Sequence, residues 1–308
     1  MKFEAGKRIF IHEVGPRDGF QAEAVFIPTA TKIAIIDRLS KCGLPKIEAT
    51  SFTSPKAIPA LADADTVMAG IERASGTKYV ALVPNAKGAE RAALARVDEV
   101  NVVMSISERH NLSNIHMTRE KSVEAIAGIC GTLSGSDIGV VVSLSTAFGC
   151  ALSGAIAQDE VLHWAGRIAH LGIAGFNVCD TIGSANPAQV DKMVHAMEGT
   201  FFGLQVSYHF HDTRGMALAN VLAAIDAGAD RFEATVGGLG GCPYAPGATG
   251  NACTEDLANM LSAAGYDTGV DAEKIAMIAR DLPAIIGHDL PSHVARVKTL
   301  TTSCQLSI

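Results

Sequence analysis

The sequence lacks the features that mark several other classes of protein. It contains no CxxC pair, and its cysteines are odd in number: Cys42, Cys130, Cys150, Cys179, Cys242, Cys253 and Cys304. This pattern disfavours a disulfide framework or a zinc finger and indicates a reduced, cytosolic protein. There is no cluster of lysine and arginine, and the net charge is −7, so we do not expect nucleic-acid binding.

Long apolar runs and phosphate-binding glycine motifs are also missing. The longest apolar stretches, such as residues 138–144, fall far short of the ~20 residues of a transmembrane helix. The basic residues within 1–8 are followed by no apolar segment, so we expect no secretory signal. No GxGxxG follows the first expected strand and no GxxxxGK[ST] occurs, which disfavours a nucleotide-binding fold.

The sequence does contain a regular alternation of β-rich and helical segments. The β-rich segments are residues 9–14, 46–50, 79–83, 99–104, 139–145, 175–180, 206–211 and 231–236. Between them, segments such as 31–42, 161–171 and 216–227 place apolar residues three and four apart, and a glycine follows each. Eight such units predict a (β/α)8 TIM barrel of the α/β class, with an open doubly wound sheet as the alternative.

We expect one domain over residues 1–308, with the barrel at about 9–265 and a helical C-terminal extension at about 266–308. The extension contains a helical segment at about 272–286. No linker, repeat or low-complexity stretch interrupts the chain.

Polar residues gather where the expected strands end, which is where barrel enzymes place their active sites. They are Arg17 and Asp18 after the first strand, Glu48 near the end of the second, Asp180 at the end of the sixth, and His209 and His211 at the end of the seventh. His209 and His211 are two residues apart on a strand, so both face the same way. Beside Asp18 they form a candidate divalent-cation site. Among the other histidines, we keep only His116 as a candidate for the site, because it lies in an expected loop.

A glycine-rich segment at 236–251 follows the eighth strand. Its length favours a binding loop or lid over a simple turn. Cys242 within it is a candidate acid or nucleophile.

Several motifs together resemble the 3-hydroxy-3-methylglutaryl-CoA lyase family, from about residue 9 to 261. They are VGPRDGFQ at 14–21, IEATSFTSPK at 47–56, DTIG at 180–183, HFHDT at 209–213 and GLGGCPYAPGATGNACTED at 238–256. The resemblance implies a metal-dependent carbon–carbon lyase of leucine degradation and ketone-body formation, which splits its substrate into acetyl-CoA and acetoacetate by retro-Claisen chemistry.

The resemblance also assigns roles to residues. It implies that Asp18, His209, His211 and Asn251 bind the metal, and that Arg17 and Cys242 are catalytic. It places Glu13, Glu48 and Asp180 in an acidic pocket, with Glu48 and Asp180 as further catalytic candidates. Arg17, Glu13 and Gln21 are the expected substrate-binding residues. The mixed nitrogen and oxygen ligands suit Mg²⁺, Mn²⁺ or Zn²⁺.

The chain departs from the family pattern at 20–22, 107–115 and 148–154, which we interpret as loops that shape the acyl and CoA pocket. We therefore expect an acyl-CoA substrate that is this thioester or a related 3-hydroxyacyl-CoA. We also expect a homo-oligomer, either a dimer or a tetramer. The alternatives are a Claisen-condensing acyltransferase of the isopropylmalate synthase type and a non-catalytic metal-binding scaffold.

Overall fold

The computed structural model describes residues 4–241 and 250–297. Eight parallel strands form a closed barrel in which each pairs with the next in the chain and β8 pairs with β1. The strands are β1 Phe10–Glu13, β2 Lys46–Ser51, β3 Lys78–Leu82, β4 Glu99–Ser105, β5 Gly139–Ser145, β6 Gly175–Asp180, β7 Gln205–Phe210 and β8 Arg231–Ala234. The closed barrel confirms the predicted fold and excludes the open sheet.

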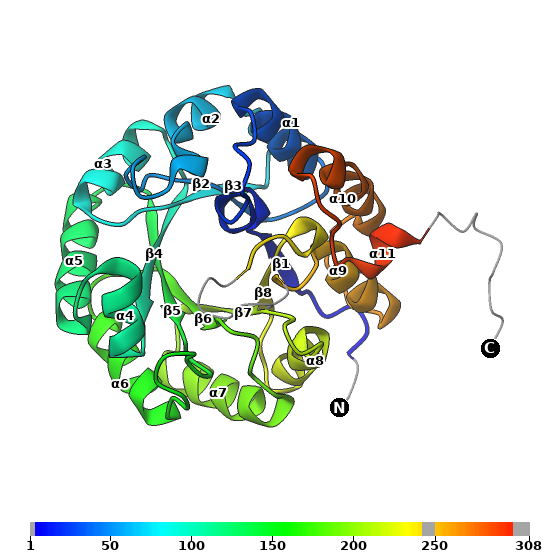
Figure 1. Ribbon diagram of the computed structural model, residues 1–308. Helices are drawn as coiled ribbons and strands as arrows, with labels where there is room; N and C mark the ends of the chain where they lie inside the picture. The colour runs from blue at the N-terminus through cyan, green and yellow to red at the C-terminus, as the bar shows by residue number, and fades with distance from the viewer. Residues whose placement is uncertain (1–3, 242–249, 298–308) are drawn as a thin grey trace.

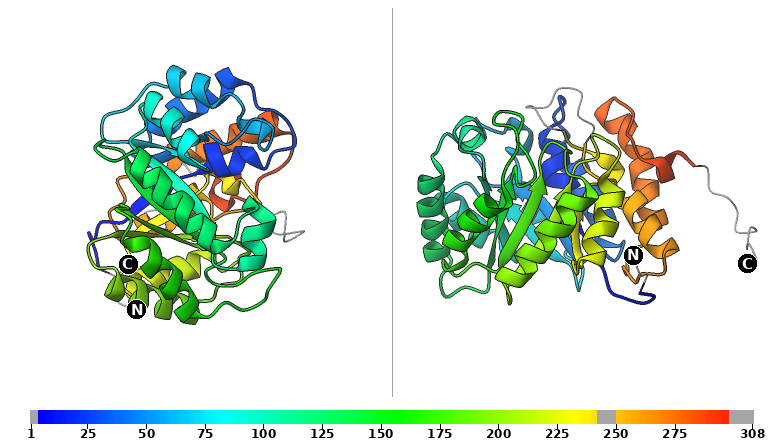
Figure 2. Two further views of the ribbon diagram at one scale, coloured as in Figure 1. Left: turned by 90° about the vertical axis from the view of Figure 1, so that its left-hand side faces the viewer. Right: turned by 90° about the horizontal axis from the view of Figure 1, so that it is seen from below.

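Helices surround the strands in a ring, as the view along the barrel axis shows (Figure 1). They are α1 Thr29–Ser40, α2 Ala64–Gly70, α3 Ala86–Leu94, α4 Glu108–Ile115, α5 Arg119–Thr132, α6 Gln158–Ala169, α7 Pro187–Thr200, α8 Ala217–Asp226, α9 Thr254–Ala263, α10 Ala272–Ile286 and α11 His293–Arg296. The predicted segment 272–286 coincides with α10. The side view shows α10 beside the barrel, outside the ring of strands (Figure 2).

Local sequence signals explain where these helices begin and end. Asn186 caps α7 by accepting a hydrogen bond from Gln189 N, while the Gln189 side chain bonds the Asn186 backbone. Gly43, which follows α1, has a φ of +80°, and an added Cβ would lie 2.0 Å from the carbonyl oxygen of Gly269. Only glycine fits this close approach between α1 and the segment before α10.

The expected loop at 107–115 is helical from Glu108 to Ile115. Ser107 caps α4 by accepting a hydrogen bond from His110 N, so this βα connection carries a short helix of its own. Within residues 4–241 and 250–297, no helix is long and apolar enough to cross a membrane.

Candidate active site

A tight turn after β1 positions Arg17 and Asp18. Residues Gly15–Gly19 form one turn of π-helix, and the Val14 carbonyl accepts hydrogen bonds from the backbone N–H groups of Arg17 and Asp18. Turns of this kind are rare and occur frequently at functional sites. The turn directs both side chains toward the carboxyl end of the barrel.

Arg17 is buried between two carboxylates. Its Nε donates to Glu48 Oε2 at 2.7 Å, and its Nη1 lies 2.6 Å from Asp18 Oδ1. Burial alone would lower the pKa of the Arg17 guanidinium, but Glu48 and Asp18 raise the pKa above its usual value. The guanidinium is therefore a fixed positive charge with a defined orientation.

Asp18, His209 and His211 lie close enough to share one metal ion. One ligand atom from each lies within 4.8 Å of the other two. The alternation of side chains along β7 brings both imidazoles into the barrel mouth, with ring centroids 5.2 Å apart. Asn251 approaches from the other side of Asp18: its Nδ2 donates to Asp18 Oδ2 at 2.8 Å. The structure thus brings together all four residues predicted to bind metal.

The donor set fits a divalent cation. Asn251 Oδ1 and His211 Nδ1 are buried and have no hydrogen-bond partner among the described residues. Buried polar atoms are normally hydrogen-bonded, so two such atoms beside a carboxylate indicate a cation site. His209 bonds Glu233 Oε2 through Nδ1 at 3.0 Å, which leaves Nε2 for the metal. A carboxylate behind a ligating histidine is a common means of orienting the ring.

The electrostatics also favour cation binding. Burial would raise the pKa of Asp18, but Arg17, His209, His211 and Asn251 lower the pKa to about 2. Burial and the neighbouring His209 lower the pKa of His211 to about 3. At neutral pH this leaves an ionised carboxylate and a neutral imidazole, which are the forms that bind metal.

A cavity of about 1430 Å³ opens above these residues. Arg17, Asp18, His209 and His211 line it together with parts of the connections after β1, β2, β3 and β4. Its size exceeds the ~300–1,000 Å³ of most small-ligand pockets, so a large substrate can be accommodated.

Comparison with known proteins identifies the family. Residues 8–282 match the family model described as HMGL-like. The chain belongs to the HMGL-like family. It is 43% identical to the hydroxymethylglutaryl-CoA lyase YngG of Bacillus subtilis, over 94% of this chain and 97% of that one. The mouse mitochondrial hydroxymethylglutaryl-CoA lyase is 41% identical, over 87% of this chain and 83% of its own.

Solved structures agree with this assignment. An HMG-CoA lyase from Acinetobacter baumannii, in complex with coenzyme A and 3-methylmalate, superposes with a TM-score of 0.90. It is 44% identical, and the match covers 96% of both chains. The resemblance noted from the sequence motifs is therefore confirmed.

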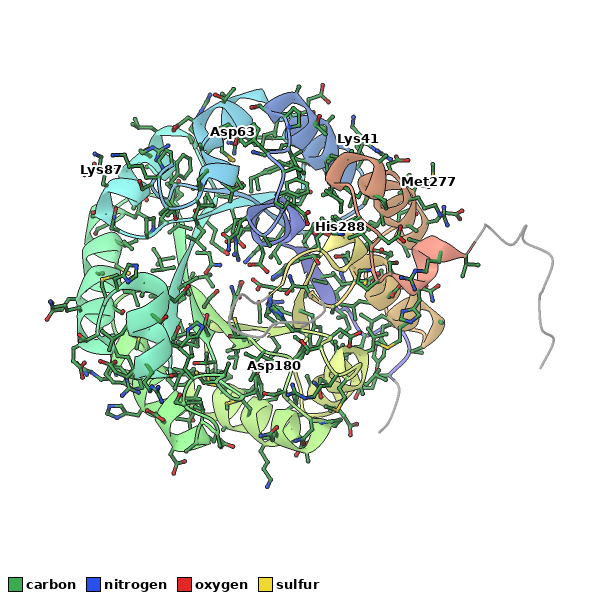
Figure 3. All side chains as sticks on the ribbon, in the orientation of Figure 1. Lys41, Asp63, Lys87, Asp180, Met277 and His288 are labelled. Carbon is green, nitrogen blue, oxygen red and sulfur yellow. The ribbon has the colours of Figure 1, made fainter. Side chains whose placement is uncertain are left out.

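Two acidic residues of this HMGL-like protein lie behind the cavity lining. Glu13 accepts hydrogen bonds from Gly15 N, Val236 N and Thr254 Oγ1. Asp180, marked in Figure 3, accepts hydrogen bonds from the backbone N–H groups of Ser184 and Ala185. Both carboxylates are thus held by neighbouring loops, and neither lines the cavity.

The other predicted residues fall in three places. Gln21 and His116 line the cavity, and Gln21 Oε1 is buried without a partner in the described part of the chain. Glu48 is the third residue of β2 and lies inside the barrel below Arg17, deeper than the expected strand end. Cys242 lies outside the described residues.

Two further carboxylates support the site and were not predicted from the sequence. Glu233 orients His209, and Glu255 accepts hydrogen bonds from the N–H of Gly237 at the start of the glycine-rich segment. Glu233 could have been noticed in the sequence as a charged residue within a short β-rich segment. Glu255 lies in the first turn of α9, where acidic residues are common, so nothing in the sequence indicated that it is buried.

Proposed function

We propose that the protein cleaves 3-hydroxy-3-methylglutaryl-CoA, or a related 3-hydroxyacyl-CoA, into acetyl-CoA and acetoacetate or a related keto acid. One observation carries this proposal. A buried arginine, held by two carboxylates, adjoins the cluster of Asp18, His209 and His211 in a single large cavity, and Asn251 bonds Asp18 beside it. Carbon–carbon cleavage next to a thioester needs both features, because one end of the substrate is an alcohol and the other becomes an enolate.

In the reaction the C3 hydroxyl loses its proton, C3 becomes a carbonyl, and the C2–C3 bond breaks. The electron pair of that bond moves into the thioester as an enolate, and C2 then takes up a proton. When bound by Asp18, His209, His211 and Asn251, a divalent cation supplies Lewis-acid polarisation of the substrate hydroxyl. The residues suit Mg²⁺, Mn²⁺ or Zn²⁺.

Arg17 stabilises the enolate. Its guanidinium is already fixed by Glu48 and Asp18, so little reorganisation accompanies the change in substrate charge. The base that takes the hydroxyl proton is one of His209, Asp18 and Asp180, and the first two line the cavity. Cys242 is the proposed donor of the proton to C2.

The size of the cavity supports an acyl-CoA substrate, with the acyl end near Arg17 and the CoA portion toward the rim. The A. baumannii relative binds coenzyme A and 3-methylmalate, a small hydroxy diacid. This supports a hydroxyacyl end of similar chemistry here. The sequence predicts a homo-oligomer, either a dimer or a tetramer, and a cytosolic location, and both stay predictions. Analytical ultracentrifugation tests the oligomeric state.

A turnover assay tests the proposal. Protein freed of metal by chelation is incubated with a panel of 3-hydroxyacyl-CoA thioesters, with and without each divalent ion, and acetyl-CoA is measured. We expect metal-dependent acetyl-CoA formation that is fastest with one 3-hydroxyacyl-CoA. The same protein with acetyl-CoA and a 2-keto acid tests the condensing activity of a synthase. Condensation without cleavage, or no turnover with any thioester, would reject the lyase proposal.

A further inference from the structure

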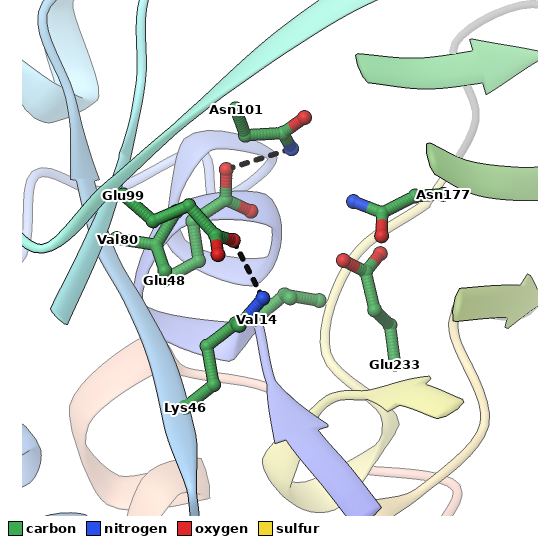
Figure 4. Close-up of a pocket in the computed structure, with 8 residues that line it drawn as sticks. All are labelled: Val14, Lys46, Glu48, Val80, Glu99, Asn101, Asn177 and Glu233. Atoms are coloured by element: carbon green, nitrogen blue, oxygen red, sulfur yellow. Dashed lines mark hydrogen bonds and ion pairs between the residues drawn. The ribbon is translucent and has the colours of Figure 1, made fainter. Parts of the chain in front are cut away.

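The barrel interior beneath Arg17 is polar. Glu48, Asn101, Ser143, Asn177 and Glu233 are all buried there, on five different strands. Figure 4 shows most of these side chains converging on the barrel axis. Barrel interiors of this type are usually filled by layers of branched apolar residues. Buried polar groups are costly unless they are hydrogen-bonded, so their arrangement needs an explanation.

These side chains form a continuous chain of hydrogen bonds that ends on Glu48. Asn177 Nδ2 donates to Ser143 Oγ at 3.2 Å, and Ser143 Oγ donates to Asn101 Oδ1 at 2.8 Å. Asn101 Nδ2 then donates to Glu48 Oε1 at 3.0 Å (Figure 4). Every donor in the chain thus points toward the Glu48 carboxylate. Hydrogen bonds connected in series polarise one another, so each strengthens the next.

The two oxygens of Glu48 have different partners. Oε2 accepts from Arg17, while Oε1 accepts from Asn101. A nearby cation does not compete for this carboxylate, because Lys46 Nζ lies 2.5 Å from Glu99 Oε1. Asn101 therefore fixes the rotation of the carboxylate plane, and that plane fixes the direction of the Arg17 guanidinium.

We propose that Asn101, supported by Ser143 and Asn177, is a positioning residue for the cleavage reaction that acts through Glu48 on Arg17. This inference rests on the proposed function, since it concerns the orientation of the group that stabilises the enolate. Ser143 also lines the large cavity, so the middle of the hydrogen-bonded chain borders the cavity, and its end on Glu48 adjoins the arginine. Asn101 itself does not line the large cavity, and its side chain bonds Glu48 and Ser143.

A double-mutant cycle with Glu48→Gln tests this role. In the wild-type background, Asn101→Ala should lower kcat about 10-fold, because a hydrogen bond to a buried charge is lost. KM and metal affinity should change less than about 3-fold, since ground-state binding uses other groups. In the Glu48→Gln background the same substitution should lower kcat less than about 2-fold, because the residue through which it acts is already altered.

Two further variants separate positioning from folding. Asn101→Leu keeps the number and branching of the side-chain heavy atoms and leaves no large cavity, so it should fold and show the same loss of kcat. Asn220→Ala is the matched control, since Asn220 is equally buried and its Nδ2 donates to the Ala185 carbonyl oxygen on the outside of the barrel. Its effect on kcat should stay below about 2-fold, and should be the same in both backgrounds, because it shares no partner with Glu48.

A spectroscopic readout makes the inference independent of turnover. The Arg17 Nε–H resonance, assigned by its loss in Arg17→Gln, should exchange with solvent faster in Asn101→Leu but not in Asn220→Ala. Faster exchange in a protein without lyase activity would reject the proposed function and keep the positioning role. Unchanged exchange together with unchanged kcat, or an equal loss of kcat in both backgrounds, would overturn the positioning role.

Discussion

At the scale of single residues, His209 in β7 and His211 just after it lie in different electrostatic surroundings. Burial would lower the pKa of His209, but its hydrogen bond to Glu233 raises the pKa above the usual value. His211 has no such carboxylate partner, and burial with the nearby His209 lowers its pKa. Glu233 thus orients His209, whereas His211 Nδ1 has no hydrogen-bond partner among the described residues.

We therefore predict that His211→Ala removes tight metal binding and most activity while the barrel remains folded. The variant removes a proposed metal ligand, so metal affinity should fall by more than the ~10–100-fold loss typical of residues that only support a ligand. Metal content after dialysis and circular dichroism measure the two effects. His195→Ala removes an exposed histidine of α7 and should change neither. Full metal occupancy in His211→Ala would exclude this residue from the site.

Arg17→Gln should lower kcat much more than it raises KM. The enolate charge develops mainly beyond the ground state, so removal of the guanidinium should cost ~10²–10³-fold in kcat. Steady-state kinetics with the best thioester of the panel provide the measurement. An effect limited to KM would mean that Arg17 only holds the substrate.

The proposed proton donor can be tested by comparing two cysteines. Cys242→Ser should leave substrate binding nearly intact and lower kcat steeply, because a serine hydroxyl is a much weaker acid than a thiol of pKa ~8.5. Cys253→Ser is the internal control, since burial raises the pKa of the Cys253 thiol well above its usual value. Near-normal kcat in both variants would leave Cys242 without a chemical role.

At the scale of elements, the sequence predicts the barrel well because periodicity and glycine positions encode it. All eight strands lie within two residues of their expected bounds, since each is a short β-rich segment between clear helical patterns. The π-turn around Arg17 and the helix α4 were not predicted, because neither has a periodic signal at that length. Interior residues such as Asn101 were missed because their role depends on neighbours from distant strands.

Close backbone packing at Gly250 determines the position of Asn251, a proposed metal ligand. Gly250 precedes Asn251, and a Cβ added to it would lie 2.0 Å from the Gly238 carbonyl oxygen. Gly250→Ala should therefore displace Asn251 and weaken metal binding ~10-fold or more, the range seen when a ligand loses its support. Gly199→Ala adds the same methyl group to α7, where nothing lies within 4 Å, and should leave metal affinity unchanged. Metal titration of both variants is the test, and equal affinities would contradict the packing argument.

At the scale of the whole molecule, one buried carboxyl group connects the two ends of the chain, and a second supports the segment that follows β8. Glu13, at the end of β1, bonds Val236 and Thr254, and Glu255 bonds Gly237. Burial raises the pKa of both Glu13 and Glu255 from 4.5 to about 7, although their hydrogen bonds oppose the shift. The closure of the barrel is thereby coupled to pH.

The sign of this coupling gives a prediction for stability. Between pH 4.5 and about 7 the folded protein holds protons on Glu13 and Glu255 that the unfolded chain has released. Below pH 4.5 both groups contribute their full stabilisation to the free energy of unfolding. This contribution is lost as pH rises through about 7. Each group contributes at most about 3 kcal/mol. Urea unfolding of metal-free protein from about pH 5 to about pH 8 should show this decline.

A comparison of variants isolates the group responsible. Glu13→Gln cannot titrate at this position, so its unfolding free energy should decline less steeply with pH than that of the wild type. Glu124→Gln removes an exposed carboxyl of α5 and should leave the slope unchanged. Glu255 repels Glu13, so the difference between the slopes reports the titration of Glu13 together with its effect on Glu255. Parallel profiles for the wild type and Glu13→Gln would show that Glu13 is ionised in the folded protein across this range, and that its three hydrogen bonds outweigh the cost of burial.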